Sequence, residues 1–240
     1  LGLTWDNEPV YQSERTAVYA QAFRALEERG LIYPCYCTRA ERLAASAPHR
    51  SDGQTIYDGR CSRLTEAERE ALSQTRRPAW RVKVGQGPIT FCDFLYGEYK
   101  EDLKTDCGDF ILRRSDGVYA YQLAVVADDA AMGVTQVVRG SDLLSSTPRQ
   151  IYLQRLLGLP EPEYGHVPLL LAADGRRLAK RDRDQELGEL QSRYTAPELL
   201  GRLAHLAGLI PEPAPITAQQ LVPLFSWEKL PREDLKVEKF

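Results

Sequence analysis

Three of the chain's five cysteines lie close to one tyrosine in the first quarter of the sequence. Cys35 and Cys37 are separated by one residue, and Cys61 lies four positions after Tyr57. A disulfide between Cys35 and Cys37 would close a very small, strained ring, which disfavours redox chemistry at this pair. Thiolates brought together by a loop are instead typical of a tetrahedral zinc site. The spacing therefore predicts one zinc ion per chain, with these three cysteines as ligands.

The residue types leave the fourth zinc ligand open among Tyr57, His49 and Asp58, which all lie in the same segment. Three thiolates and a phenolate would give the zinc site a net negative charge, which is costly away from water unless a cation offsets it. If Tyr57 is the fourth ligand, we therefore expect it to be a weak or neutral one. The other two cysteines, Cys92 and Cys107, are expected to be structural. Four nearby arginines can supply the compensating charge: Arg39, Arg42, Arg60 and Arg63.

Other chemically active side chains lie in the second half of the chain. Arg139 ends a predicted strand, where α/β folds place residues that contact ligands. The segment "ADGRRLAKRDRD" (173–184) carries five arginines and lysines, which suit either a solvated loop or contact with phosphate. His166 lies beside an apolar run, so we expect a structural role, with ATP contact as the alternative. For Asp128 and Asp129 we expect a solvated or helix-capping role and no catalytic one.

Helices must position several of these residues. The segment "SERTAVYAQAFRALEERG" places Tyr19, Phe23 and Leu26 on one helical face, and Gly30 is the expected stop. Capping boxes, in which a threonine and a glutamate three residues later satisfy each other's backbone amides, predict further helix starts. These boxes are Thr38 with Glu41, Thr65 with Glu68, and Thr195 with Glu198.

The middle of the chain favours strands. Short β-rich runs occupy 79–84, 88–94 and 109–114, and Asp116-Gly117 predicts a tight hairpin turn. A helical run "QLAVVADDAAMG", a strand at 135–140, a helix with Pro148 near its first position and a strand in "HVPLLLAADG" follow. Alternation of strand and helix over 109–172 predicts an α/β fold with a largely parallel sheet, followed by a helical tail from about residue 195.

Composition limits the class of protein. The chain has 240 residues, 43% of them hydrophobic, which suits one large domain or a domain with a small appendage. Its net charge of −3 means that a nucleic-acid partner would have to be held by local patches. An odd cysteine count and no visible signal peptide or membrane segment indicate a cytoplasmic protein without a membrane partner. The first residue is Leu1 and the one methionine is Met132, so we expect an N-terminal part to be missing.

The cysteine pattern carries a family resemblance. A C-x-C pair, nineteen residues and then Y-x-x-x-C resembles the zinc module of the glutamyl-tRNA synthetase group of class I. The segments "LGLTWD", "YQSER" and "DFILRRSDGVYAYQLAVVADDAAMGVTQVVRGSDLLSSTPRQIYLQRLLGLP" are similar to the same group, so the resemblance runs from Leu1 to about Arg181. It is nearest to the branch that lacks an anticodon-binding domain, because only 60 residues follow Lys180.

The resemblance implies a fold and its divisions. We expect an α/β, Rossmann-like class I synthetase core with an inserted zinc-binding subdomain and a short helical C-terminal appendage. Residues 1–30 would complete the first half of the nucleotide-binding fold, and 31–107 would form the inserted, acceptor-type subdomain. Residues 108–184 would form the second half with the lysine loop, and 185–240 the helical region.

The resemblance also assigns site residues. It implies Cys35, Cys37, Tyr57 and Cys61 as zinc ligands, Tyr121 and Arg139 as glutamate-binding residues, and Lys180 as the second lysine of the K-M-S-K-S loop that meets ATP phosphates. The loop departs from its pattern at Arg177 and Ala179. The H-x-G-H motif of the group is absent, so we expect this chain alone not to make glutamyl-adenylate.

The implied reaction is activation of glutamate by ATP with Mg²⁺, then transfer to the queuosine base at the wobble position of tRNA(Asp). The expected partners are glutamate, ATP and tRNA(Asp) carrying queuosine, and the expected state is a monomer. A core fragment of a full glutamyl-tRNA synthetase is the first alternative. A zinc-stabilised RNA-binding module without catalysis comes next, and a thiol redox protein is the most distant.

Overall fold

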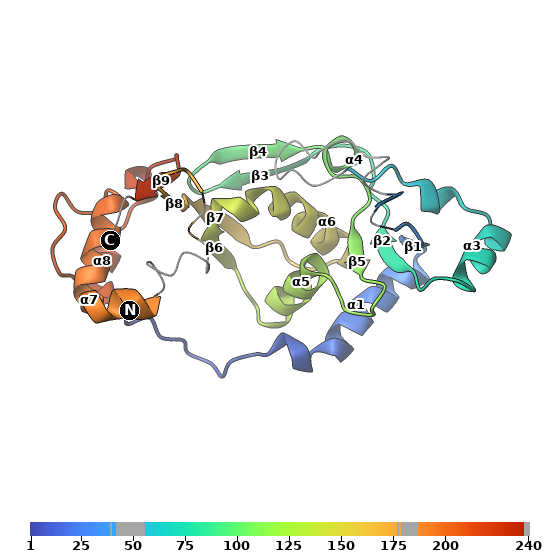
Figure 1. Cartoon of the computed structure of the whole chain (residues 1–240), viewed down its shortest axis with the longest axis horizontal. Coiled ribbons are helices and arrows are strands. Elements are labelled where there is room, and N and C mark those ends of the chain that lie inside the picture. Colours follow the sequence, from blue (N-terminus) through green and yellow to red (C-terminus); the bar gives the residue numbers. More distant parts are fainter. Residues whose placement is uncertain (39, 42–55, 177, 179–186, 238–240) are drawn as a thin grey trace.

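The structure is a computed structural model that describes residues 1–38, 40–41, 56–176, 178 and 187–237. A mixed sheet with its helices occupies the middle of an elongated molecule (Figure 1). A smaller antiparallel sheet with helix α3 lies towards one end, and the C-terminal helices lie at the other. In the part of the chain described, no helix combines the length and apolar character that crossing a bilayer requires.

The first long helix forms where the apolar spacing predicts it. Helix α1 (Thr16–Glu28) follows the short 3-10 helix η1 (Gln12–Glu14) and buries Tyr19, Phe23 and Leu26. Gly30 follows the helix end with a φ of 64°, a left-handed conformation that glycine adopts without strain. The buried stripe of α1 contributes Phe23 and Leu26 to the main hydrophobic core, so the predicted helix is confirmed.

A three-stranded antiparallel sheet carries the cysteine segment. Its order is β1 (Ile32–Cys35), β2 (Ala79–Val82) and β5 (Ile111–Arg113). Between β1 and β2 lie the 3-10 helix η2 (Arg60–Arg63) and helix α3 (Glu66–Ser73). The capping box of Thr65 and Glu68 starts α3 as predicted.

The central sheet has the order β4-β3-β7-β6. β3 (Ile89–Asp93) and β4 (Gly97–Glu101) form an antiparallel hairpin, whereas β6 (Gln136–Gly140) and β3 both run parallel to β7 (Glu163–Val167). The 3-10 helix η3 (Ser141–Ser146) and helix α6 (Thr147–Leu157), with proline in its first turn, connect β6 to β7. Helix α5 (Tyr121–Ala131) packs against both α1 and α6, and a short helix, α4 (Leu103–Asp106), follows β4.

Two strand expectations need correction. The run 109–114 does not join the parallel sheet, because β5 pairs with β2 in the antiparallel one, while β3 and β4 supply the central sheet instead. The apolar run after His166 forms two strands, β7 and β8 (Leu170–Ala172), separated at Pro168, which lacks the N–H that a continuous ladder needs. Strand pairing thus crosses the expected boundary between 107 and 108, and the domain division stays a prediction.

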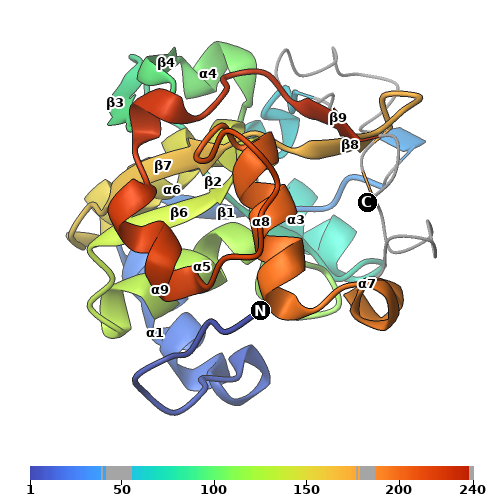
Figure 2. The same cartoon turned by 90° about the vertical axis from the view of Figure 1, so that its left-hand side faces the viewer.

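The tail is largely helical, as expected, and returns to the core. Helices α7 (Leu187–Arg193), α8 (Ala196–Leu206) and α9 (Ala218–Leu221) lie at one end of the molecule (Figure 2). The capping box of Thr195 and Glu198 starts α8. After 3-10 helices η5 (Val222–Leu224) and η6 (Trp227–Lys229), β9 (Leu235–Val237) pairs in parallel with β8.

Candidate functional site

The four predicted metal ligands come together at the end of β1. The sulfur atoms of Cys35, Cys37 and Cys61 all lie within 4.8 Å of one another. The Tyr57 hydroxyl is 3.4 Å from Cys35 Sγ and 3.5 Å from Cys37 Sγ. Cys35, Cys61 and Tyr57 are buried and Cys37 is partly exposed, so most of the cluster is shielded from water. Three soft sulfur donors and one oxygen donor in this arrangement fit Zn²⁺.

Local backbone geometry brings Tyr57 to the cysteines. Tyr57 forms an isolated parallel bridge with Gly108, and the Tyr57 hydroxyl accepts the amide N–H of Cys61 at 3.1 Å. Gly108 has a φ of 70°, and a Cβ there would lie 2.4 Å from the Tyr57 carbonyl oxygen. Glycine is therefore required at 108 for this close approach.

The cluster favours thiolate at Cys35 and a neutral phenol at Tyr57. The hydrogen bond with Cys61 lowers the pKa of Cys35, and the charge of Arg81 adds to that shift although burial opposes it. Burial, together with hydrogen bonds to the three thiols, raises the pKa of Tyr57 above its ordinary range. This direction agrees with the expectation that Tyr57 is a weak or neutral ligand.

Of the other two candidates for the fourth ligand, Asp58 and His49, Asp58 alone lies among the described residues. The Asp58 carboxylate pairs with Arg60 at 2.9 Å near the surface, so it is not available to the cluster. His49 lies outside the described residues, as do Arg39 and Arg42.

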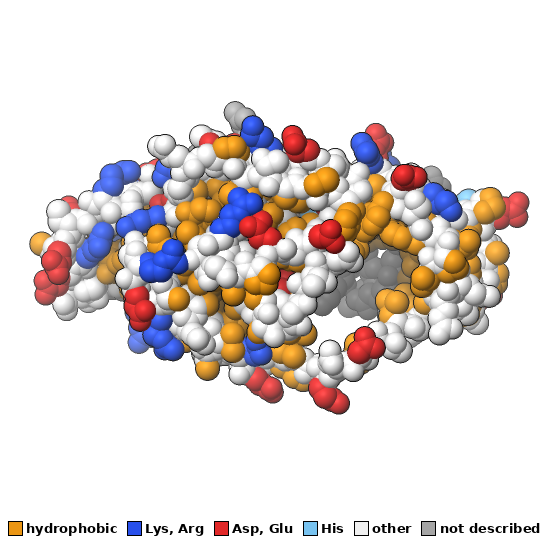
Figure 3. Space-filling view, turned by 180° about the vertical axis from the view of Figure 1, so that it is seen from behind, with side chains coloured by type: hydrophobic (Ala, Val, Ile, Leu, Met, Phe, Trp, Pro, Cys, Tyr) orange, Lys and Arg blue, Asp and Glu red, His pale blue; other side chains and the backbone are white. Residues whose placement is uncertain are grey.

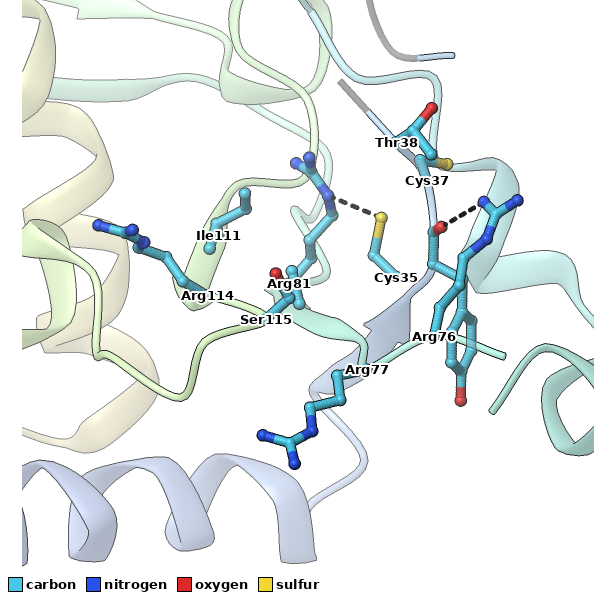
Figure 4. Close-up of a pocket in the computed structure, with 11 residues that line it drawn as sticks. Cys35, Cys37, Thr38, Arg76, Arg77, Arg81, Ile111, Arg114 and Ser115 are labelled. Atoms are coloured by element: carbon cyan, nitrogen blue, oxygen red, sulfur yellow. Dashed lines mark hydrogen bonds between the residues drawn. The ribbon is translucent and has the colours of Figure 1, made fainter. Parts of the chain in front are cut away.

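The cation beside the sulfur cluster is Arg81, a residue that the sequence did not single out. It lies on β2, is buried, and its Nε donates to Cys35 Sγ at 3.3 Å (Figure 4). Its guanidinium stacks 3.8 Å from the centre of the Tyr57 ring. By contrast, Arg60 pairs with Asp58, and Arg63 donates to the Asp58 carbonyl oxygen. The sequence could have indicated this role, because Arg81 lies inside the apolar strand "AWRVKV" and a buried charge needs a partner.

A basic hollow lies next to the sulfur cluster. It encloses about 330 Å³, and Cys35 and Cys37 are part of its wall. No carboxylate is among the described residues that line it. A neighbouring hollow of about 290 Å³ shares Arg77 and Arg114 with it and adds Trp80. The arginines of the two walls are Arg76, Arg77, Arg81, Arg113 and Arg114.

These arginines differ in their partners. Arg76 donates to the Tyr36 carbonyl oxygen at 3.1 Å and pairs with Glu41, and Arg114 pairs with Asp116 at 2.6 Å. Arg77 makes none of the bonds drawn in Figure 4. On the face shown in Figure 3, lysine and arginine side chains gather towards the end with β1, β2 and α3. The hollow therefore offers a local positive field on a chain of net negative charge.

A second site forms where β6 ends. Tyr121 is the first residue of α5 and is half exposed, and Arg139 lies on β6 and is half buried. Burial lowers the pKa of the Arg139 guanidinium, and the nearby Tyr121 and Tyr164 hydroxyls and the Asp129 carboxylate oppose that shift. The structure thus brings together the two residues expected to bind glutamate, although glutamate binding itself stays a prediction.

Arg139 is held by neutral acceptors. Its Nε donates to His166 Nε2 at 3.0 Å, and its Nη2 donates to Thr147 Oγ1 at 2.8 Å and to the Leu143 carbonyl oxygen at 3.4 Å. His166 is fully buried, which suits the structural role expected for it.

Two further expectations concern Asp128 and the loop that contains Lys180. Asp128 is buried rather than solvated, because it accepts hydrogen bonds from Gln12, Arg15 and Tyr19 and so ties the N-terminal segment to α5. Lys180, with Arg177 and Ala179, lies outside the described residues. A cleft shared by Lys180 and Arg139 therefore stays a prediction.

Comparison with known proteins gives consistent results. A family model described as tRNA synthetases class I (E and Q), catalytic domain, matches residues 1–222. The chain is 45% identical to the glutamyl-Q tRNA(Asp) synthetase of Symbiobacterium thermophilum, over 99% of this chain and 77% of that protein. It is 48% identical to the protein of the same name from Nitratidesulfovibrio vulgaris, over 98% of this chain and 76% of that protein.

Among solved structures, the chain is similar to a glutamate tRNA ligase from Elizabethkingia meningosepticum, with a TM-score of 0.76 and 21% sequence identity. The match covers 97% of this chain and 52% of that one, so the chain spans about half the length of this structure. At this identity the likeness shows a shared fold.

Proposed function

Because the chain belongs to the class I tRNA synthetase family for glutamate and glutamine, among the glutamyl-Q tRNA(Asp) synthetases, we propose that it activates glutamate with ATP. We further propose that it transfers the glutamyl group to the queuosine base of tRNA(Asp). The observation that carries the choice of amino acid is a half-buried arginine, Arg139, which makes its hydrogen bonds to neutral acceptors among the described residues and has the Asp129 carboxylate as a nearby charge. Such a cation favours a ligand that brings a carboxylate, as the side chain of glutamate does.

The reaction proceeds in two balanced steps. The α-carboxylate of glutamate attacks the α-phosphorus of ATP, and pyrophosphate leaves with the electrons of the broken P–O bond. A queuosine hydroxyl then attacks the carbonyl of the mixed anhydride, which releases AMP. Arg139 and Tyr121 bind the side-chain carboxylate of glutamate, which leaves the α-carboxylate free to react. Lys180 and the Mg²⁺ that accompanies ATP would offset the negative charge that develops on the phosphates.

We assign the sulfur cluster a structural role. When bound, zinc would join the end of β1 to η2 through Cys35, Cys37, Cys61 and a neutral Tyr57. Because Cys35 and Cys37 also line the basic hollow, this link would fix the wall of that hollow.

The basic hollow supplies a site for the tRNA partner. Arginines on a concave surface bind phosphate groups in a planar, directional manner, and a tryptophan nearby adds a stacking surface for a base. Arg77 and Arg114 line both hollows, and Trp80 lines the second. We therefore place backbone phosphates of the tRNA along this groove.

The decisive experiment measures both steps with the full-length protein. We expect glutamate-dependent exchange of pyrophosphate into ATP in the absence of tRNA. We also expect glutamate to be attached to tRNA(Asp) that carries queuosine and not to the same tRNA with guanine at that position. Attachment that ignores queuosine and blocks the terminal ribose would instead support a glutamyl-tRNA synthetase.

A further inference from the structure

A chain of hydrogen bonds crosses three neighbouring strands beneath the proposed glutamate site. Asp93 ends β3, His166 lies on β7 and Arg139 lies on β6, which is the order of these strands in the sheet. Asp93 Oδ2 is 2.6 Å from His166 Nδ1, and His166 Nε2 is 3.0 Å from Arg139 Nε. The exposed fraction is 1% for Asp93 and 0% for His166. Neither residue has a role in the two steps described above.

The aspartate end of this chain is fixed as an anion. Asp93 Oδ1 accepts the amide N–H groups of Leu95 and Tyr96, each at 3.0 Å, and Oδ2 accepts the amide of His166 at 3.1 Å. Burial alone would raise the pKa of Asp93, but the hydrogen bonds from His166 and these amides outweigh it and hold the pKa below its ordinary value. Asp93 therefore accepts hydrogen bonds at both oxygens.

This arrangement fixes the tautomer of the histidine. A carboxylate 2.6 Å from Nδ1 requires the proton on Nδ1. The guanidinium Nε of Arg139 carries a proton at all times, so His166 Nε2 must offer a lone pair to it. His166 is thus a neutral imidazole that accepts from the arginine on one side and donates to the aspartate on the other.

These hydrogen bonds determine which N–H groups of Arg139 remain available to bind a ligand. Nε is used by His166, and both protons of Nη2 are directed at Thr147 and at the Leu143 carbonyl oxygen. The Tyr121 hydroxyl, the Asp129 carboxylate and the Tyr164 ring also lie near the guanidinium. Nη1 is therefore the part of the guanidinium to which we assign the ligand.

We propose that Asp93 and His166 are positioning residues that orient Arg139 so that Nη1, beside the Tyr121 hydroxyl, meets the side-chain carboxylate of the substrate. The proposal deepens the proposed function and rests on it. It differs from a two-nitrogen grip by Arg139, because Nε and Nη2 are already occupied by the protein.

The test is Asp93→Asn in the full-length protein. An asparagine amide can donate to His166 Nδ1, which moves the imidazole proton to Nε2, where it opposes the N–H of Arg139 Nε. We expect the KM for glutamate in pyrophosphate exchange to rise about 10- to 100-fold, with the KM for ATP unchanged. Asp109→Asn is the matched control, because Asp109 is also a buried carboxylate, bonded to Tyr33 and the Val84 amide in the other sheet. Its KM for glutamate should stay within about twofold.

A spectroscopic measurement separates positioning from simple loss of fold. The chain has 3 histidines, so ¹⁵N-histidine NMR gives few signals, and His205→Gln assigns one of them by difference. The His166 signal should show the Nδ1–H tautomer in the unchanged protein and the Nε2–H tautomer in Asp93→Asn. An Nε2–H or doubly protonated His166 in the unchanged protein would overturn the proposal.

The kinetic outcomes distinguish the positioning role of Asp93 and His166 from the binding of glutamate by Arg139. An unchanged KM for glutamate in Asp93→Asn, with a raised one in Arg139→Gln, would overturn the positioning role and leave the glutamate site in place. An unchanged KM in both variants would overturn the assignment of Arg139 as the glutamate-binding residue.

Discussion

At the scale of single residues, two arginines illustrate opposite uses of a buried guanidinium. Arg81 lies against sulfur atoms that become anionic, so its charge is compensated within the fold. Arg139 has neutral hydrogen-bond acceptors among the described residues and the Asp129 carboxylate as a nearby charge, so we expect a ligand carboxylate to complete its compensation. Burying either guanidinium costs desolvation free energy, and a nearby anionic partner offsets that cost. The two residues therefore lead to two separate predictions.

Replacing Arg139 by alanine should weaken glutamate binding by about 2–5 kcal/mol, because the carboxylate loses a directional, charged hydrogen-bond donor. Titration calorimetry with glutamate measures this change. The control is Arg155→Ala, which removes an exposed arginine paired with Glu161 at 2.8 Å on the same molecule and should leave glutamate affinity unaltered. Equal affinity in the Arg139 variant and the unchanged protein would contradict the assignment.

Replacing Arg81 by glutamine should reduce zinc affinity about 10- to 100-fold, because the thiolates lose the cation that offsets their charge. Competition with a chromophoric chelator measures the dissociation constant without any need for enzymatic activity. Arg63→Gln serves as the control, since Arg63 is exposed and directed at the Asp58 carbonyl oxygen. An identical zinc affinity in all three proteins would show that Arg81 does not balance the site.

At the scale of elements, helix starts were the most predictable feature of the chain. The three expected capping boxes are all present, and a fourth, between Thr217 and Gln220, starts α9. The reason is that a cap is local: its donors and acceptors lie within four residues of one another. The fourth was missed because its partner is glutamine rather than glutamate.

One such cap carries a direct prediction. Thr65→Ala should lower the free energy of unfolding by about 0.5–2 kcal/mol, because the amide at the start of α3 loses its acceptor. The matched control is Thr75→Ala near the other end of α3, where the exposed hydroxyl only donates to the Leu72 carbonyl oxygen. Denaturant titration followed by circular dichroism compares the two. A smaller loss at Thr65 than at Thr75 would contradict the role of the cap.

Strand partners were less predictable than helices, for a physical reason. Alternation of apolar residues tells which face of a strand is buried and says nothing about its neighbour in the sheet. The run 109–114 was therefore expected in the parallel sheet, although β5 joins β2. The same limit hid Arg81, which meets Cys35 only because β1 and β2 pair with Tyr33 opposite Arg81. The cysteine cluster was predictable from the short spacing of Cys35 and Cys37 together with the family resemblance.

At the scale of the whole molecule, charge is distributed unevenly. The net charge is −3, yet five arginines line two adjoining hollows beside the sulfur cluster. Because an RNA backbone releases counterions when it is neutralised, binding at these hollows should depend steeply on salt. The RNA partner is thus expected to recognise one end of the molecule.

The double variant Arg77→Gln with Arg114→Gln should weaken tRNA binding and reduce the slope of log affinity against log salt by about 1 for each arginine. Fluorescence anisotropy at several salt concentrations measures both quantities. Arg24→Gln, on the exposed face of α1, is the control with the same loss of charge per site. Glutamate activation without tRNA should be unchanged in every variant. A slope unaffected by the double variant would place the RNA elsewhere.

The pairing of β8 with β9 joins the C-terminal tail to the strand that follows β7. β8 precedes Lys180 in the sequence, and β9 pairs with β8 from more than sixty positions further along the chain. Gly165 leaves room for the Trp227 ring, which a Cβ would approach to 2.3 Å, so the tail also rests on β7. The tail is therefore anchored to the strand that precedes the proposed phosphate-binding loop, so we expect a displacement of the tail to shift β8 as well.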